Sequence, residues 1–174
     1  MLSMKLLLVV SVMTGLFADQ CSLGDLGIAE FADKVTVSNI GSTADAFVSV
    51  KFNHGQVSLG IEAGKSRTAI ALAATRYTVK VLGRGDSDWI SYKDTLLRLR
   101  EQLQELTLSS RATPDQVANA ATELTLVLSA LEQMNGSAVL QSCSGKLVSG
   151  VTSQVTVNWT RTADGTGLWV LVCG

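Results

Sequence analysis

The sequence predicts a mainly β protein of the α+β class, an antiparallel β-sandwich of about seven or eight strands with two inserted helices. Three observations support this fold class. Apolar and polar residues alternate with a period of two over residues 33–82, the period changes to about 3.6 over 89–134, and alternation returns over 137–173. Alternation places one face of a strand on a core, whereas a period of 3.6 is typical of an amphipathic helix.

Five short strands account for the first region. Their apolar positions are Val35 and Val37; Ala46, Val48, Val50 and Phe52; Val57, Leu59 and Ile61; Ile70 and Leu72; and Tyr77, Val79 and Val81. Turn residues separate these runs, and strands this short and evenly spaced favour a sandwich over alternating strand–helix units. Gly60, inside the third strand, indicates a bulge.

The helical hairpin spans about 89–135, between the fifth and sixth strands. The apolar stripe of its first helix is Tyr92, Leu96, Leu99, Leu103 and Leu106. The second helix begins at Thr113 as N-cap, with Pro114 in the first turn and Gln116 three residues after the cap. The apolar stripe of this second helix is Val117, Ala121, Leu124, Leu128 and Leu131. Asn135-Gly136 ends it as a left-handed cap.

Strands return after residue 137. Val155, Val157 and Trp159 alternate with polar residues, and Asp164-Gly165 predicts a two-residue hairpin turn. The segment 168–172 is apolar on both parities, so we expect that strand to lie between neighbours or to be covered on both faces.

The domain organisation begins with a signal peptide at 1–20, in which a charged start precedes a short apolar run. One sandwich domain then spans 21–174. The alternative is a sandwich at 30–83 followed by an α+β unit at 89–174, and in either case the glycine-rich segment 83–87 is the seam.

Three cysteines follow or lie beyond this signal. In an oxidising compartment we expect a Cys143–Cys173 disulfide, although a bridge from Cys21 to either of them stays open. Cys21 resembles the lipid-bearing cysteine of bacterial lipoproteins, so it is lipidated, free, or paired with another chain. The sequence therefore predicts a secreted, periplasmic or cell-surface protein that meets a membrane only if Cys21 is lipidated.

The segment Arg84-Gly85-Asp86-Ser87 resembles the integrin-binding sequence of extracellular-matrix proteins, which implies a binding site at Arg84, Gly85 and Asp86. The simpler interpretation is a glycine turn followed by Asp86 or Ser87 capping the next helix. Asn135 and Asn158 each fit the N-glycosylation pattern.

Catalytic constellations are missing from the sequence. His54 is the single histidine and is expected in a turn, so we expect no metal site and no histidine-assisted nucleophile. The segment 63–66 ends like a phosphate-binding loop but lacks the required upstream glycine, and we expect a β-turn there. The glutamates of the helices are expected on solvated faces. The formal net charge of -1 implies no basic face and argues against a nucleic-acid partner.

Three stretches between 34 and 83 follow a familiar order: VTVSN at 35–39, AGKSRT at 63–68 and RYTVKV at 76–81. This order resembles immunoglobulin-like sandwich modules of secreted bacterial proteins. The resemblance implies a fold and brings no catalytic residues with it.

Two functions are therefore expected. The first is a non-catalytic binding or assembly module of the cell envelope or extracellular space, structural or adhesive, which acts through protein–protein contacts with a partner or with itself and needs no cofactor. The second is a small-ligand carrier or an unrecognised enzyme, with a pocket between hairpin and sheet near Tyr92, Asp86 and Asp88.

Overall fold

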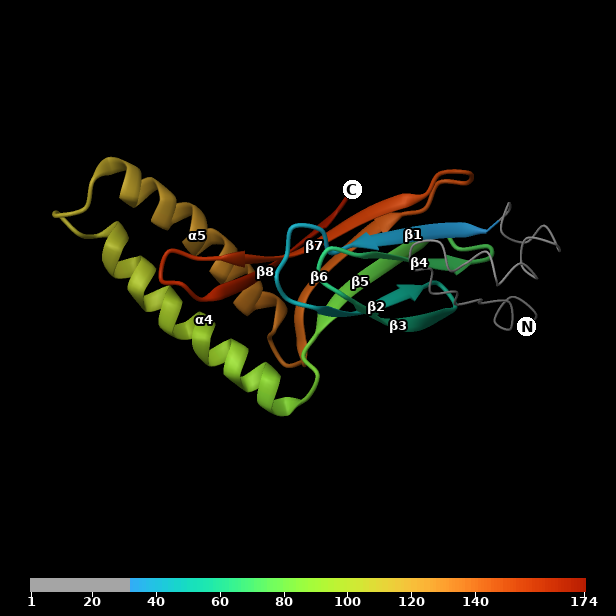
Figure 1. Ribbon diagram of the computed structural model, residues 1–174, viewed down its shortest axis with the longest axis horizontal. Coiled ribbons are helices and arrows are strands. Elements are labelled where there is room, and N and C mark those ends of the chain that lie inside the picture. Colours follow the sequence, from blue (N-terminus) through green and yellow to red (C-terminus); the bar gives the residue numbers. More distant parts are fainter. Residues whose placement is uncertain (1–31) are drawn as a thin grey trace.

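The computed structural model describes residues 32–174, which form eight strands in two sheets and two helices (Figure 1). In chain order the elements are β1 (Asp33–Ser38), β2 (Ala46–Phe52), β3 (Gly55–Ile61), β4 (Ser66–Ala71), β5 (Arg76–Leu82), α4 (Asp86–Thr107), α5 (Pro114–Gln133), β6 (Val139–Lys146), β7 (Ser153–Arg161) and β8 (Gly167–Cys173). The expected signal peptide at 1–20 and Cys21 lie outside the described residues.

Each sheet has four strands and combines strands that precede the two helices in the sequence with strands that follow them. One sheet has the order β4-β1-β7-β8 and the other β3-β2-β5-β6. The expectation of a wholly antiparallel sandwich is wrong at one pairing, because β1 runs parallel to β7. Parallel neighbours need a long connection, and everything from β2 to β6 lies between these two strands.

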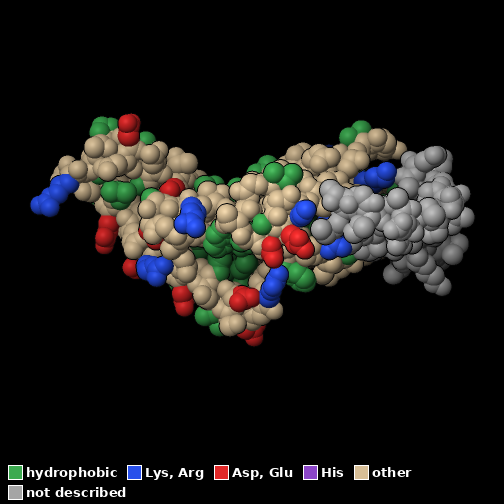
Figure 2. Space-filling model, in the orientation of Figure 1, with side chains coloured by type: hydrophobic (Ala, Val, Ile, Leu, Met, Phe, Trp, Pro, Cys, Tyr) green, Lys and Arg blue, Asp and Glu red, His purple; other side chains and the backbone are tan. Residues whose placement is uncertain are grey.

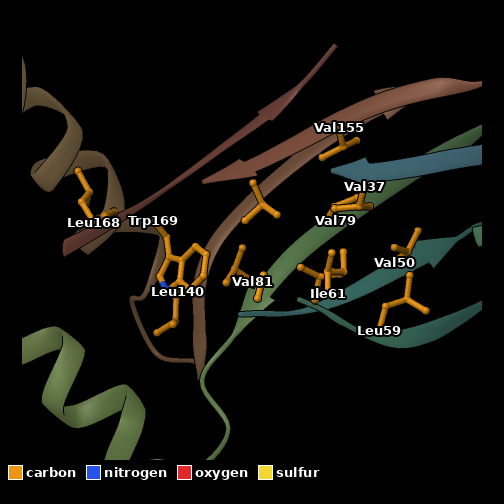
Figure 3. Packing of buried hydrophobic residues seen from close by; sticks show 14 of the residues in the cluster. Val37, Val50, Leu59, Ile61, Val79, Val81, Leu140, Val155, Leu168 and Trp169 are labelled. Carbon is orange, nitrogen blue, oxygen red and sulfur yellow. The ribbon is translucent and has the colours of Figure 1, made fainter. Parts of the chain in front are cut away.

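The core fills the space between the sheets (Figure 3). Its side chains come from the inward parity of each strand, as the alternation predicts, and the fully buried ones include Val37, Val50, Leu59, Val79 and Val155. Trp169 and Leu140 continue the core toward the helices, so the sandwich and the helices share one apolar interior.

The helix pair, α4 and α5, projects from one end of the sandwich, with the two helices packed side by side (Figure 1). In α4 the buried residues are Tyr92, Leu96, Leu99 and Leu103, as predicted. In α5 they are Ala120, Val127 and Ala130. The predicted stripe is wrong at Ala121 and Leu128, which are exposed, whereas its other members are half-buried: Val117, Leu124 and Leu131.

The start of α5 is confirmed in detail. The Thr113 hydroxyl accepts a hydrogen bond from the Gln116 N–H at 3.2 Å, and the Gln116 side chain accepts one from the Thr113 N–H at 2.9 Å. This reciprocal box satisfies two backbone donors that a helix start leaves without intrahelical partners. At the start of α4 the N-cap is Gly85, with no side-chain capping bond, so the expectation that Asp86 or Ser87 caps this helix is wrong.

The β7–β8 connection differs from the predicted two-residue turn. Pairing ends at Arg161 and Gly167, and the Thr162 N–H donates to the Thr166 carbonyl at 3.0 Å. Only Gly165 of the Asp-Gly pair has a positive φ, at 84°, whereas the predicted turn requires both residues there. Asp164 instead accepts hydrogen bonds from Thr162 and Thr166, which closes a longer loop.

Two further strand expectations are corrected. Strand β8 is not between neighbours but at the edge of its sheet, and its second half is only partly buried. It reaches β6 of the other sheet, where the predicted Cys143–Cys173 disulfide is confirmed. Gly60 sits in an unbroken β2–β3 register, and the irregularity lies instead between Val81 and Leu82.

Candidate functional site

A cleft of about 460 Å³ lies where the helix pair meets the sandwich. Figure 2 shows a hollow there with hydrophobic side chains at its floor and charged side chains beside it. The cleft is lined from both sheets and from α4, by Ala44, Asp45, Phe47, Leu82, Gly83, Arg84, Asp88, Ser91, Tyr92, Thr95, Leu140, Trp159, Thr166, Gly167 and Trp169. Segments far apart in the sequence therefore meet at one site.

Three aromatic rings from α4, β7 and β8 pack edge to face in the cleft lining. The ring centroids of Tyr92 and Trp159 are 6.1 Å apart with planes at 81°, and those of Trp159 and Trp169 are 5.0 Å apart at 67°. Edge-to-face packing is the favoured arrangement of aromatic pairs. Trp169 is buried, whereas Trp159 is half-buried, so Trp159 keeps surface that a ligand can cover.

Gly167 makes room for this arrangement. Trp159 and Gly167 lie close together where the β7–β8 ladder ends, and a Cβ atom on Gly167 would overlap the Trp159 ring. Because any larger residue would push the indole away, this glycine positions the central ring of the aromatic cluster.

Tyr92 holds the edge of β8 against α4. Its hydroxyl accepts a hydrogen bond from the Trp169 backbone N–H at 3.0 Å, in a buried environment. Burial raises the pKa of Tyr92 far above its ordinary value, and the bond from Trp169 offsets only part of that rise. The phenol therefore stays protonated at physiological pH and cannot serve as a general base.

Two more hydrogen bonds fix the helix pair to the sandwich. The Glu123 carboxylate of α5 accepts from the Ala163 N–H at 3.1 Å, and the Gln133 side chain accepts from the Ser142 N–H at 2.6 Å. Glu123, expected on a solvated face, is half-buried, and its bond to Ala163 lies at an exposed position. These contacts make the cleft a preformed site.

Charged side chains stand at the rim. Asp45, Arg84 and Asp88 line the cleft, and all three are exposed. The Asp45 carboxylate also accepts a hydrogen bond from the Ala63 N–H at 3.0 Å, which holds it in place. The rim therefore offers both signs of charge around an apolar floor.

The predicted binding triplet is only partly at this site. Arg84 lines the cleft, Gly85 caps α4, and Asp86 is exposed in the first turn of that helix outside the lining. Of the residues expected beside a pocket between helices and sheet, Tyr92 and Asp88 do line one.

The remaining predicted positions lie elsewhere. His54 is exposed in the β2–β3 turn, Asn135 is exposed just after α5, and Asn158 is half-buried in β7. Within residues 32–174, no three His, Cys, Asp or Glu side chains gather closely enough to hold a metal ion. Neither α4 nor α5 has the length and apolar character needed to cross a bilayer.

Sequence reasoning missed Phe47, Trp159 and Trp169 as site residues. The available signal was the concentration of tryptophan near the C-terminus of a chain with 5% aromatic residues. No family model, curated protein or solved structure matches this chain.

Proposed function

We propose that this protein is a non-catalytic binding or assembly module of the cell envelope or extracellular space, acting through protein–protein contacts. The observation that carries the proposal is the aromatic-floored cleft beside α4. In this proposal the cleft receives an apolar side chain of the partner.

The composition of the cleft supports this function. Trp, Tyr and Arg are the residues most enriched among energetic hot spots of protein interfaces, and those hot spots cluster in pockets surrounded by polar groups. Trp159 and Trp169 supply the floor, and Arg84 with the two aspartates supplies the rim. The site is held in shape by Gly167 and by the Tyr92 hydrogen bond, so little ordering cost opposes binding.

The chemistry at the cleft favours binding over catalysis. Tyr92 is held protonated by burial, and the lining contains neither histidine nor cysteine. Asp45 is already engaged by a backbone N–H. No pair of lining groups forms the nucleophile and base that covalent catalysis requires.

The compartment fits the proposal. The Cys143–Cys173 disulfide indicates an oxidising, non-cytoplasmic compartment. Export through the segment 1–20 and kinship with immunoglobulin-like modules are part of the proposal, and two packed four-stranded sheets support the kinship.

Site-specific photo-crosslinking tests the proposal. A benzoylphenylalanine is placed at Ser91, which is exposed and lines the cleft, and in a second protein at Gln102, which is exposed on α4 away from it. In the source cells we expect a discrete protein adduct from position 91, absent from 102 and reduced by Trp159→Ala. Equal adducts from both positions, or none from 91, would contradict the proposal.

A small-ligand carrier is the second candidate, because the cleft volume of about 460 Å³ lies in the range of small-molecule sites, roughly 300–1,000 Å³. Native mass spectrometry of the purified protein separates the two functions. A bound small mass that is lost in Trp159→Ala, without any protein adduct at position 91, would favour the carrier.

The adhesive version of the proposal depends on Arg84, Gly85 and Asp86. If these residues engage an integrin-type receptor, Asp86→Glu abolishes cell attachment, because the longer side chain moves the carboxylate. Unchanged attachment would remove this version and leave the cleft proposal standing.

A further inference from the structure

A second surface lies on the outer face of the sheet β3-β2-β5-β6, away from the core. The ladder registers assign its positions: Lys51 pairs with Thr78, Lys80 with Ser142, and Arg76 with Lys146. Their strand neighbours Val50, Val79 and Tyr77 point inward and are buried, so these residues point outward. Lys51, Arg76 and Lys146 are exposed and Lys80 is half-buried.

We call Lys51, Arg76, Lys80 and Lys146 the cationic face. Strands lie about 4.8 Å apart and alternate residues about 6.6 Å apart, so the four charges fit within roughly 10 by 13 Å. This is comparable to one Debye length at physiological ionic strength, so the charges act together on an approaching anion. No outward position among them carries Asp or Glu.

The arrangement is unfavourable for the free protein. Arg76 and Lys146 lie directly opposite each other across β5 and β6, and like charges so placed destabilise a sheet. A hollow of about 460 Å³ adjoins this end of the face, and its lining is Lys51, Phe52, Asn53, His54, Arg76, Tyr77 and Thr78. Lys51 and Arg76 thus place positive charge beside a recess large enough for an anionic group.

The expectation of no basic face, which rested on net charge, is therefore wrong. The two helices carry eight acidic residues, five in α4 and three in α5, against three basic residues, all in α4. The negative charge of the helices therefore offsets the positive charge of this sheet in the net charge of the chain.

The residues between the cations identify the kind of partner. They are polar and small, and the accessible ones are Ser58 on β3, Thr78 on β5 and Ser144 on β6. Ser49 on β2 is buried, and the Ser142 hydroxyl on β6 donates to the Gln133 side chain of α5. The hydroxyls of Thr78 and Ser144 hydrogen-bond to each other at 2.8 Å. Apolar outward residues begin only at Phe47 and Leu82, which belong to the cleft.

This chemistry discriminates among polyanions. Single-stranded nucleic acid is bound through aromatic side chains that stack its bases, and protein interfaces use apolar anchors at their centre. The outward strand positions of the cationic face have neither, and the two aromatic residues in the lining of the hollow, Phe52 and Tyr77, are on the inward parity of their strands and are buried. The cationic face matches a partner that is anionic and hydroxyl-rich along its whole length.

We propose that the cationic face and its adjoining hollow bind an acidic polysaccharide. The lysines and Arg76 pair with its carboxylate or sulfate groups, and the hydroxyls of Ser58, Thr78 and Ser144 hydrogen-bond to its sugar hydroxyls. None of the four cations lines the cleft, so this proposal can be tested independently of the function proposed above.

The test measures binding of polygalacturonate to the full chain by calorimetry, with neutral dextran as the blank. The variant K51Q/K80Q/K146Q is compared with K65Q/K93Q/R111Q, which removes the same charge from positions off the face. We expect binding that weakens with added NaCl and falls roughly tenfold or more in the face variant. The control variant should change less than about twofold. Circular dichroism and thermal melting verify that both variants fold.

Each other outcome would overturn the proposal. Equal losses in both variants mean non-specific attraction, and no binding to polygalacturonate removes the partner. Tighter binding to polyglutamate assigns the face to an acidic protein, and binding only to anionic lipid vesicles assigns it to a membrane. Self-association by sedimentation that disappears in the face variant assigns it to the acidic helices of a second copy. If the face variant does not fold, R76Q alone is measured against R111Q by the same criteria.

Discussion

The hydrogen bond between Tyr92 and the edge of β8 makes a sharp prediction for stability. Tyr92→Phe removes one oxygen and leaves the ring, so its edge-to-face packing on Trp159 at 6.1 Å is retained. The Trp169 N–H then loses its 3.0 Å partner in a buried environment. A buried donor left without a partner costs about 1–3 kcal/mol. If Tyr92→Phe lowers the free energy of unfolding by about 2 kcal/mol, the Tm of a chain of this size falls by about 4–8 °C.

The assay is urea unfolding followed by tryptophan fluorescence, with calorimetry for Tm. Tyr77→Phe is the matched control, because Tyr77 is also buried but no backbone N–H among residues 32–174 donates to its hydroxyl, whose polar neighbour is the side chain of Ser153. We expect Tyr77→Phe to change the free energy of unfolding by less than about 0.5 kcal/mol. If the two variants lose the same stability, the hydrogen bond does not hold β8 to α4 and the reasoning fails.

Three further predictions follow from the same structure. The double variant Cys143→Ala/Cys173→Ala should lose about 3.6 kcal/mol of unfolding free energy in urea, from the 30-residue separation of the bridge. Gly167→Ala should displace the Trp159 ring, cost about 1–3 kcal/mol and reduce the near-ultraviolet circular dichroism of the aromatic cluster. Above about pH 10 the unfolded phenol of Tyr92 loses its proton while the folded one keeps it, so stability should fall with rising pH in the wild type, and less steeply in Tyr92→Phe.

Gly60→Ala is the control for Gly167→Ala. Its added methyl group would come no closer than 3.9 Å to the Phe47 side chain, and Gly60 lies within β3 without a positive φ. A loss of stability in Gly60→Ala equal to that of Gly167→Ala would show that steric overlap with Trp159 is not the cause.

The strands and helices were predictable because their patterns are local. Alternation placed Val48 and Val79 in the core, and Thr113 with Gln116 marked the start of α5. The Cys143–Cys173 pairing was also predictable, since both residues lie in C-terminal strands. Each of these inferences uses residues close in sequence or a small number of possible partners.

The buried face of α5 and the cleft were not predictable in this way. The stripe was assigned by side-chain size, but α5 buries Ala120 and Ala130 and leaves Leu128 exposed. The cleft requires Phe47 of β2 and Trp159 of β7 to meet at α4, and no local pattern encodes that meeting. The cationic face likewise depends on strand order, because its charges come from three strands.

The position of β1 in the middle of its sheet has a consequence for the newly made chain. Its parallel partner begins at Ser153, opposite Val35, so 118 residues separate the two, from 35 to 153. At translation rates of about 5–20 residues per second, that partner is synthesised roughly 6–24 s later. During this interval β4 can pair with one edge of β1, but the other edge carries unpaired backbone groups, which favour aggregation. A truncation that removes the last quarter of the chain would remove β7, so this edge of β1 would never gain its partner.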